Sequence, residues 1–145
     1  IIDKPIGRAR YDRKRQAITA KGRDAVTGWK VLRQFPPFSS HVECKLKTGR
    51  THQIRVHMAH IGHGLIGDRL YGRALSKSQM PDNLARLALS QMRTFKRQAL
   101  HASHLGFEHP ITKEPLSFET PLPDNMANLL QFIEHSVSAR ARGET

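Results

Sequence analysis

The feature that most constrains the fold of this chain is a proline pair, Pro36-Pro37, between two segments of alternating polarity. Neither proline can donate a backbone hydrogen bond to a neighbouring strand, so residues 35–40 predict a turn. The segment before the turn, residues 25–32, alternates around Thr27, Trp29 and Val31. The segment after it, residues 41–47, alternates around Val42, Cys44 and Leu46. This pattern predicts an antiparallel hairpin with one buried and one solvent-exposed face.

Cys44 is the only cysteine among the 145 residues. It lies on the apolar side of the predicted hairpin, which favours a small core residue over a reactive thiol, because reactive cysteines are partly exposed. A single cysteine cannot form an internal disulfide, and we therefore expect a protein of the reducing cytoplasm.

The period of the apolar residues changes after Thr48-Gly49-Arg50. An apolar stripe then repeats at intervals of four and three residues, which predicts a helix; its members are Ile54, Met58 and Ile61. We expect the Thr51 hydroxyl to cap the start of this helix, and the glycines at positions 62 and 64 to end it.

The remaining residues predict two more helices and two more strands. Residues 73–83 are polar and predict an exposed insertion. Residues 84–95 predict a helix with an apolar side formed by Leu84, Leu87 and Met92. Residues 99–108 and 116–119 predict strands, and a last helix carries a stripe of Met126, Leu129, Leu130, Ile133 and Val137.

Strands and helices follow one another without a regular β-α-β rhythm, so the sequence predicts an α+β fold, mainly antiparallel sheet with flanking helices. A length of 145 residues favours one domain. We expect this domain to span residues 1–137 and residues 138–145 to form a frayed tail.

The chain has 24 Lys and Arg against 12 Asp and Glu, a net charge of +12. Residues 1–55 hold 14 basic and 4 acidic residues, whereas residues 101–145 hold 3 basic and 6 acidic residues. The excess is densest from Arg8 to Arg15 and recurs at Lys45, Lys47, Arg50 and Arg55. A charge concentrated in this way indicates a polyanionic partner. No basic helix with bulky apolar anchors lies in this half, so we expect no membrane partner.

A metal site is not supported by the clustered histidines at positions 52, 57, 60 and 63. On a helix, His52 and His57 point about 140° apart. A helix-borne zinc site needs histidines at i and i+4 with a glutamate between them, which is absent here. Phosphate-binding and serine-hydrolase motifs are also absent, so we expect no metal and no nucleotide hydrolysis.

The start of the predicted helix, after Gly49, is suited to an anion, because backbone N–H groups and the helix dipole favour negative charge there. Arg55 lies at the edge of the buried face of that helix, where an arginine usually pairs with a carboxylate. Its spacing alone favours a structural salt bridge over a functional role.

The ten residues Thr48-Gly49-Arg50-Thr51-His52-Gln53-Ile54-Arg55-Val56-His57 resemble the signature helix of the RluA/RluD family of RNA pseudouridine synthases. Other segments resemble further blocks of that family in order and spacing: Ile2 to Arg8, Gly67 to Gly72, Arg97 to Ala102, His109-Pro110 and Pro121-Leu122-Pro123. The resemblance extends from Ile2 to about Ile133.

This resemblance implies an antiparallel-sheet core with a cleft for a flipped uridine, and isomerisation of uridine to pseudouridine without a cofactor. The family uses an invariant Asp, a Tyr beside the base, and an Arg or Lys paired with the Asp. The basic partner carries over to Arg55, and such a pairing keeps a carboxylate ionised. Leu100 is the residue expected to pack near the target base.

The family's Asp stands in a Gly-Arg-Leu-Asp block, which precedes the segment that Ile2 to Arg8 resembles. Neither that block nor the Tyr-bearing block occurs in this sequence. Asp3 and Asp68 stand in other blocks, and we expect Asp68 to fix a loop. The sequence is therefore interpreted as the C-terminal portion of a synthase whose nucleophile lies elsewhere in the parent protein, and we expect the isolated portion to be inactive.

The expected partner is RNA of the large ribosomal subunit, bound by a monomer. The residues expected to contact RNA are Arg8, Arg10, Arg13, Lys14, Arg15, Lys47, Arg50, His52 and Gln53. The alternative hypothesis is a non-catalytic, basic RNA-binding or ribosome-associated module.

Overall fold

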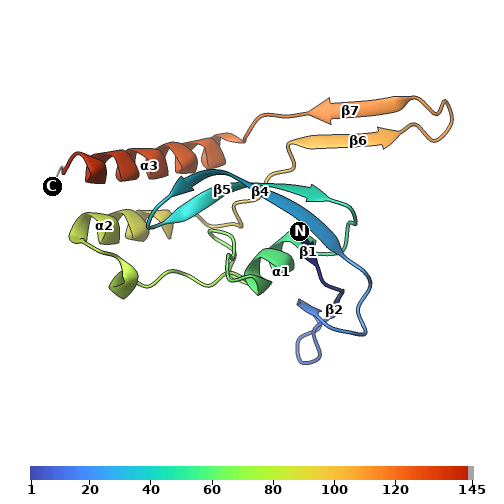
Figure 1. Cartoon of the computed structure of the whole chain (residues 1–145), viewed down its shortest axis with the longest axis horizontal. Helices are drawn as coiled ribbons and strands as arrows, with labels where there is room; N and C mark the ends of the chain where they lie inside the picture. The colour runs from blue at the N-terminus through green and yellow to red at the C-terminus, as the bar shows by residue number, and fades with distance from the viewer. Residues whose placement is uncertain (144–145) are drawn as a thin grey trace.

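The computed structural model describes residues 1–143 and contains three antiparallel sheets (Figure 1). The largest sheet has the order β1-β4-β5, from Ile2–Asp3, Val26–Phe35 and Ser39–Leu46. The other two pair β2 (Ile6–Arg8) with β3 (Gln16–Ile18), and β6 (His104–Glu108) with β7 (Pro115–Glu119). The helices are α1 (Gln53–His60), α2 (Asn83–Met92), α3 (Asp124–Ala141) and a short 3-10 helix, η1 (Lys77–Gln79). The predicted α+β class is confirmed.

The hairpin of β4 and β5 forms where the proline pair predicts it, with Phe35 opposite Ser39 and Thr27 opposite Leu46. The prediction of one buried face is wrong for the middle of the hairpin. Trp29 and Val31 keep 39% and 36% of their surface exposed, and Cys44 is half-buried. Helices cover only the two ends: α1 packs at Thr27, and α2 and α3 pack at Phe35.

Two separate apolar clusters hold these layers together. The larger one joins the hairpin turn to α2 and α3 and consists of Phe35, Phe38, Met80, Ala85, Ala88, Leu89, Met92 and Ile133. The smaller one, beside α1, consists of Ile6, Ala25 and Val56. Because Met80 is buried in the larger cluster, the prediction that residues 73–83 form an exposed insertion is wrong at this position. Leu87, predicted on the apolar side of α2, is 69% exposed because the packed side of this helix runs through Ala85 and Leu89.

The buried face of helix α1 agrees only in part with the predicted stripe. Met58 is buried as predicted, whereas Ile54 and Ile61 are only half-buried, and the other buried residues are Gln53, Val56 and His57. His52, not Thr51, occupies the N-cap position, in a left-handed conformation with φ 56°. The cap prediction is wrong because the Gln53 side chain itself accepts the Arg50 N–H, at 3.0 Å.

The C-terminal part contains the least covered element. Figure 1 shows β6 and β7 projecting from the rest of the molecule, and Leu105, Phe107 and Phe118 on them are exposed. The predicted strand at 99–108 begins only at His104. Helix α3 continues past position 138 to Ala141, and Arg140 binds Asp82 (Nη2–Oδ2, 2.9 Å). Of the predicted tail, residues 144–145 lie outside the described residues.

No helix within residues 1–143 has both the length and the apolar character needed to cross a membrane.

Candidate functional site

The first turn of α1 is fixed by a buried polar network centred on Gln53. The Gln53 Nε2 group donates to the carbonyl of Val26 at 3.0 Å and to the Thr27 hydroxyl at 2.9 Å. Its Oε1 atom accepts from the Thr48 hydroxyl at 2.8 Å and from the N–H of Arg50. The Thr48 hydroxyl in turn accepts the N–H of Val26. One glutamine therefore joins the Gly49 turn, α1 and β4.

His57 extends this network to the N-terminal segment. Its ring is fully buried, with Nε2 at 2.9 Å from the carbonyl of Lys4 and Nδ1 at 2.8 Å from the Thr27 hydroxyl. A carbonyl only accepts, so Nε2 carries the hydrogen and Nδ1 accepts the hydroxyl proton of Thr27. The neutral Nε2–H form satisfies every donor and acceptor around the ring.

Arg55, on the next face of α1, forms a two-bond ion pair with Asp68. Nε and Nη2 of the arginine donate to the two carboxylate oxygens at 2.8 and 2.9 Å. The Asp68 side chain is completely buried, and the Arg55 side chain is 12% exposed. The carboxylate partner that the position of Arg55 requires is thus present in the described chain.

Asp68 also fixes its own loop, as predicted. Its Oδ1 atom accepts the backbone N–H groups of Leu70 at 3.0 Å and Tyr71 at 3.1 Å. Burial by itself raises the pKa of the Asp68 carboxyl, but the hydrogen bonds from Arg55, Tyr71 and Leu70 and the charge of Arg55 hold the pKa below its usual value. The loop needs Gly67, because a Cβ there would lie 2.0 Å from the carbonyl oxygen of Arg97.

Tyr71 connects this ion pair to the basic N-terminal segment. Its ring lies under the guanidinium groups of Arg55, at 4.9 Å, and Arg15, at 5.5 Å. Its hydroxyl accepts the N–H of Gln16 at 2.8 Å and contacts Nδ1 of His52 at 2.7 Å. Burial, followed by the charge of Arg55, lowers the pKa of His52, which favours the neutral imidazole.

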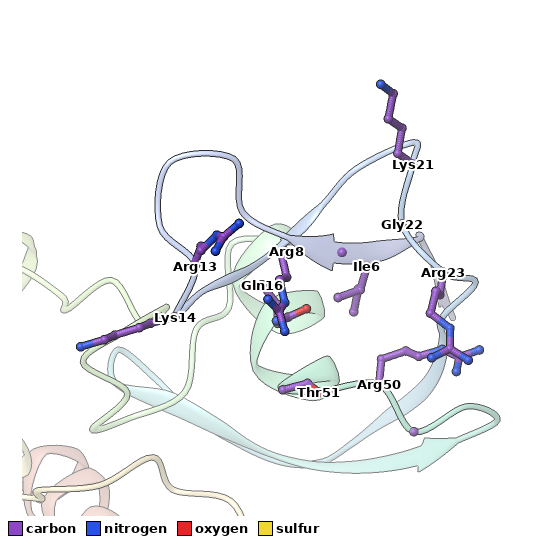
Figure 2. Close-up of a pocket in the computed structure, with 12 residues that line it drawn as sticks. Ile6, Arg8, Arg13, Lys14, Gln16, Lys21, Gly22, Arg23, Arg50 and Thr51 are labelled. Carbon is purple, nitrogen blue, oxygen red and sulfur yellow. The ribbon is translucent and has the colours of Figure 1, made fainter.

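A basic cavity of about 520 Å³ opens beside this corner (Figure 2). Cationic side chains from the N-terminal segment, the loop after β3 and the Gly49 turn line it: Arg8, Arg13, Lys14, Lys21, Arg23 and Arg50. No acidic residue among residues 1–143 lines the cavity. Gln16, whose N–H donates to the Tyr71 hydroxyl, is among the residues that line it. The lining of the cavity is therefore strongly cationic, and Gln16 joins it to the Tyr71 hydroxyl.

The structure brings together four of the residues predicted to contact RNA, namely Arg8, Arg13, Lys14 and Arg50. The others lie elsewhere: Arg15 stacks on Tyr71, Arg10 on Tyr11, and Lys47 is exposed outside the cavity lining. Lys21 and Arg23 were not predicted. Two cations around Gly22 are a signal in the sequence, but only the folded structure shows that both line the same cavity.

The prediction that Gln53 contacts RNA is wrong, because its side chain is 3% exposed and both ends of its amide are bonded within the protein. Leu100 is half-buried and follows Ala99, whose N–H donates to the carbonyl of Ile66 at 2.8 Å. Leu100 thus lies in the segment beside the Asp68 loop. Residues 1–143 contain no group of three or more His, Cys, Asp or Glu side chains placed to hold a metal ion.

Comparisons with known proteins identify the family of this chain. Residues 1–60 match the model of the family described as RNA pseudouridylate synthase. Ribosomal large subunit pseudouridine synthase D of Xanthomonas campestris is 43% identical over 139 residues, covering 96% of this chain and 40% of that protein. The chain belongs to the RNA pseudouridine synthase family. The resemblance predicted from the motif at residues 48–57 is confirmed.

Two further relatives support the family assignment. The RNA pseudouridine synthase YlyB of Bacillus subtilis is 47% identical over 130 residues, which cover 90% of this chain and 37% of that protein. The solved structure of human RNA Pseudouridylate Synthase Domain Containing 1 matches 92% of this chain and 58% of its own, with a TM-score of 0.61 and 26% identity. The chain spans about 40% of the length of the curated relatives it matches.

Proposed function

We propose that this chain is the part of an RNA pseudouridine synthase that holds RNA phosphates and orients the catalytic carboxylate, acting on uridine in large-subunit ribosomal RNA. The observation that carries the proposal is the basic cavity that leads through Gln16 to Tyr71 and Arg55. The similarity to synthases named for the large ribosomal subunit supports the proposed substrate class. We further propose that the protein acts in the cytoplasm as a monomer.

Arg55 is the proposed partner of a nucleophilic Asp that lies outside this chain. Two of the five guanidinium N–H groups donate to Asp68, so three are available to a second carboxylate. Because the arginine is shielded from water, an incoming carboxylate would gain a strong, charge-assisted contact and stay ionised. In this proposal the Arg55–Asp68 pair is both a structural salt bridge and the support that aims the free N–H groups.

The remaining roles follow from the position of each side chain. Arg8, Arg13, Lys14 and Arg50 bind phosphates and hold the strand while the target base leaves the stack. Leu100, in the segment beside the Asp68 loop, offers apolar contact to the extruded base. Isomerisation breaks and remakes a bond between the same base and sugar, and the proposal includes no cofactor and no metal.

The test measures pseudouridine formation by the full-length protein on a large-subunit ribosomal RNA transcript. Arg55→Lys keeps the charge but not the planar donor set, and we expect kcat to fall by about 100-fold or more, as for loss of a preorganised charge partner. Arg86→Gln, an exposed substitution on α2, is the matched control and should leave kcat unchanged.

Two outcomes would contradict the proposal. A wild-type rate for Arg55→Lys would show that Arg55 does not support the chemistry. RNA binding by the full-length wild-type protein without any pseudouridine would favour the alternative of a non-catalytic RNA-binding module, which the basic cavity also fits.

A further inference from the structure

Arg23 and Arg50 occupy one end of the basic cavity, and neither has a carboxylate partner among the ion pairs of residues 1–143. Figure 2 shows their side chains extending to the same side of the cavity. The Nε group of Arg50 donates to the carbonyl of Asp24, the residue that follows Arg23, at 2.9 Å. Two guanidinium groups therefore lie in one region without a neutralising group.

The backbone around Arg23 is held firmly against β2. Its N–H donates to the carbonyl of Ile6, and its carbonyl accepts the Ile6 N–H, both at 2.9 Å. The preceding Gly22 packs so tightly that a Cβ there would lie 2.5 Å from the Ile6 carbonyl carbon. Arg23 is thus anchored by the sheet edge rather than carried on a loose loop.

Arg50 is anchored at its backbone and at the Nε atom of its side chain. Its backbone N–H donates to the buried Gln53 side-chain amide, and its Nε–H donates to the carbonyl of Asp24. The two terminal nitrogens are left as a fork of donors whose direction is set by these contacts. Such a fork matches the geometry of two phosphate oxygens.

We propose that Arg23 and Arg50 bind one phosphate group together, as a clamp for the backbone of a single RNA strand. The two positive charges repel each other when the site is empty, and a shared anion removes that repulsion. The identity of the strand as substrate RNA rests on the proposed function, whereas the clamp itself rests on the geometry of the two arginines. Arg23 lies outside the signature segment at residues 48–57, and its partner Arg50 lies inside it.

The experiment measures binding of a fluorescent single-stranded RNA oligonucleotide to the full-length protein over a series of KCl concentrations. Arg23→Gln and Arg50→Gln are each expected to weaken binding about tenfold. The double variant should lose less than the product of the two single losses, because both side chains serve the same phosphate. The salt slope, which is the slope of log K for RNA binding against log [KCl], should fall in magnitude by about 0.7 in the double variant, the value for one single-strand phosphate.

The controls separate the clamp from a general loss of charge. Lys30→Gln removes an exposed charge from β4, outside the cavity lining, and should change binding by less than about twofold, because a distant exposed charge is screened by salt. Arg23→Lys, which keeps the charge and the backbone anchor, should give an intermediate loss. Unchanged urea midpoints are expected for the Arg23 variants, and at most a small decrease for Arg50→Gln, which loses the exposed hydrogen bond from Nε to the Asp24 carbonyl.

If the two single losses of RNA affinity multiplied in the double variant and its salt slope fell by about 1.4, the shared phosphate would be overturned, because these results indicate two separate contacts. Inorganic phosphate competes for the clamp, so at matched ionic strength it should displace RNA more strongly from the wild type than from the double variant; equal displacement from both would overturn the clamp as a phosphate site. Pseudouridine formation is measured in parallel. Its absence in the wild type contradicts the proposed function alone, whereas wild-type RNA affinity in the double variant contradicts the clamp alone.

Discussion

Two adjoining regions of this protein use polar side chains in opposite ways. Around α1, Gln53, His57 and Asp68 are buried, and each of their polar atoms has a partner within the chain. In the basic cavity, cations such as Arg13 and Lys14 are exposed and no acidic residue joins them in the lining. The first arrangement holds the fold together, and the second leaves charge available to a ligand.

The segment from Thr48 to His57 takes part in both regions. Thr48, Gln53 and His57 face the interior and bind β4 or the N-terminal segment. Arg50 faces the cavity, and Arg55 lies between the two regions. A single run of ten residues therefore combines scaffold and ligand-facing positions, and the substitutions below distinguish them.

The largest effect is expected from breaking the Arg55–Asp68 pair. Arg55→Ala leaves a fully buried carboxylate without its cation, and loss of one partner of a buried pair costs about 3–5 kcal/mol of unfolding free energy. Urea unfolding of the full-length protein at pH 7 measures this loss. The double variant Arg55→Ala/Asp68→Ala should recover part of it, and a loss below about 1 kcal/mol, the range of an exposed pair, would contradict the burial of this one.

The same pair predicts a direction for the pH dependence. The pKa of Asp68 is lowered in the folded protein, so its contribution is present above the unfolded value of about 3.9 and is lost as the pH falls through the folded pKa. The stability difference between wild type and Asp68→Asn should therefore shrink on acidification below about pH 4. A difference that stays constant down to pH 2 would be inconsistent with this assignment.

Next in size is the Gln53 network. Gln53→Leu removes an amide that bonds four groups and leaves several of them buried without partners, each worth about 1–3 kcal/mol. We expect a clear drop in the urea midpoint. The salt slope of RNA binding should not change, since Gln53 is 3% exposed; a reduced slope in a folded variant would restore Gln53 as an RNA contact.

The division between these regions explains what the sequence could predict. Local rules sufficed for the β4–β5 hairpin, because two prolines and strict alternation leave few other structures. For α1 they predicted the helix and the buried Met58 but not the buried polar side chains, since the burial of Gln53 and His57 depends on partners 26–53 residues away in sequence. Likewise, the need of Arg55 for a carboxylate was predictable, but the choice of Asp68 was visible only in three dimensions.

A smaller effect is expected at Tyr71, which joins the two regions. Tyr71→Phe keeps the ring beneath Arg15 and Arg55 but removes the hydroxyl contacts to Gln16 and His52. We expect a loss of about 1 kcal/mol in unfolding free energy. RNA affinity should fall more than in Gln53→Leu, because the segment carrying Arg13 and Lys14 loses its tie to α1; equal RNA binding by Tyr71→Phe and wild type would show that the tie does not position the cavity.

The smallest effect on the fold is expected for Arg13→Gln, because this side chain is exposed and lines only the cavity. The urea midpoint should be unchanged, whereas RNA binding should weaken several-fold and the salt slope should fall by about 0.7. Arg10→Gln is the matched control: it lies in the same segment, stacks on Tyr11 and is absent from the cavity lining. If both substitutions reduced RNA affinity equally, the cavity would be only part of a diffuse basic surface. The cavity would then not be a defined binding site distinct from the paired scaffold around α1.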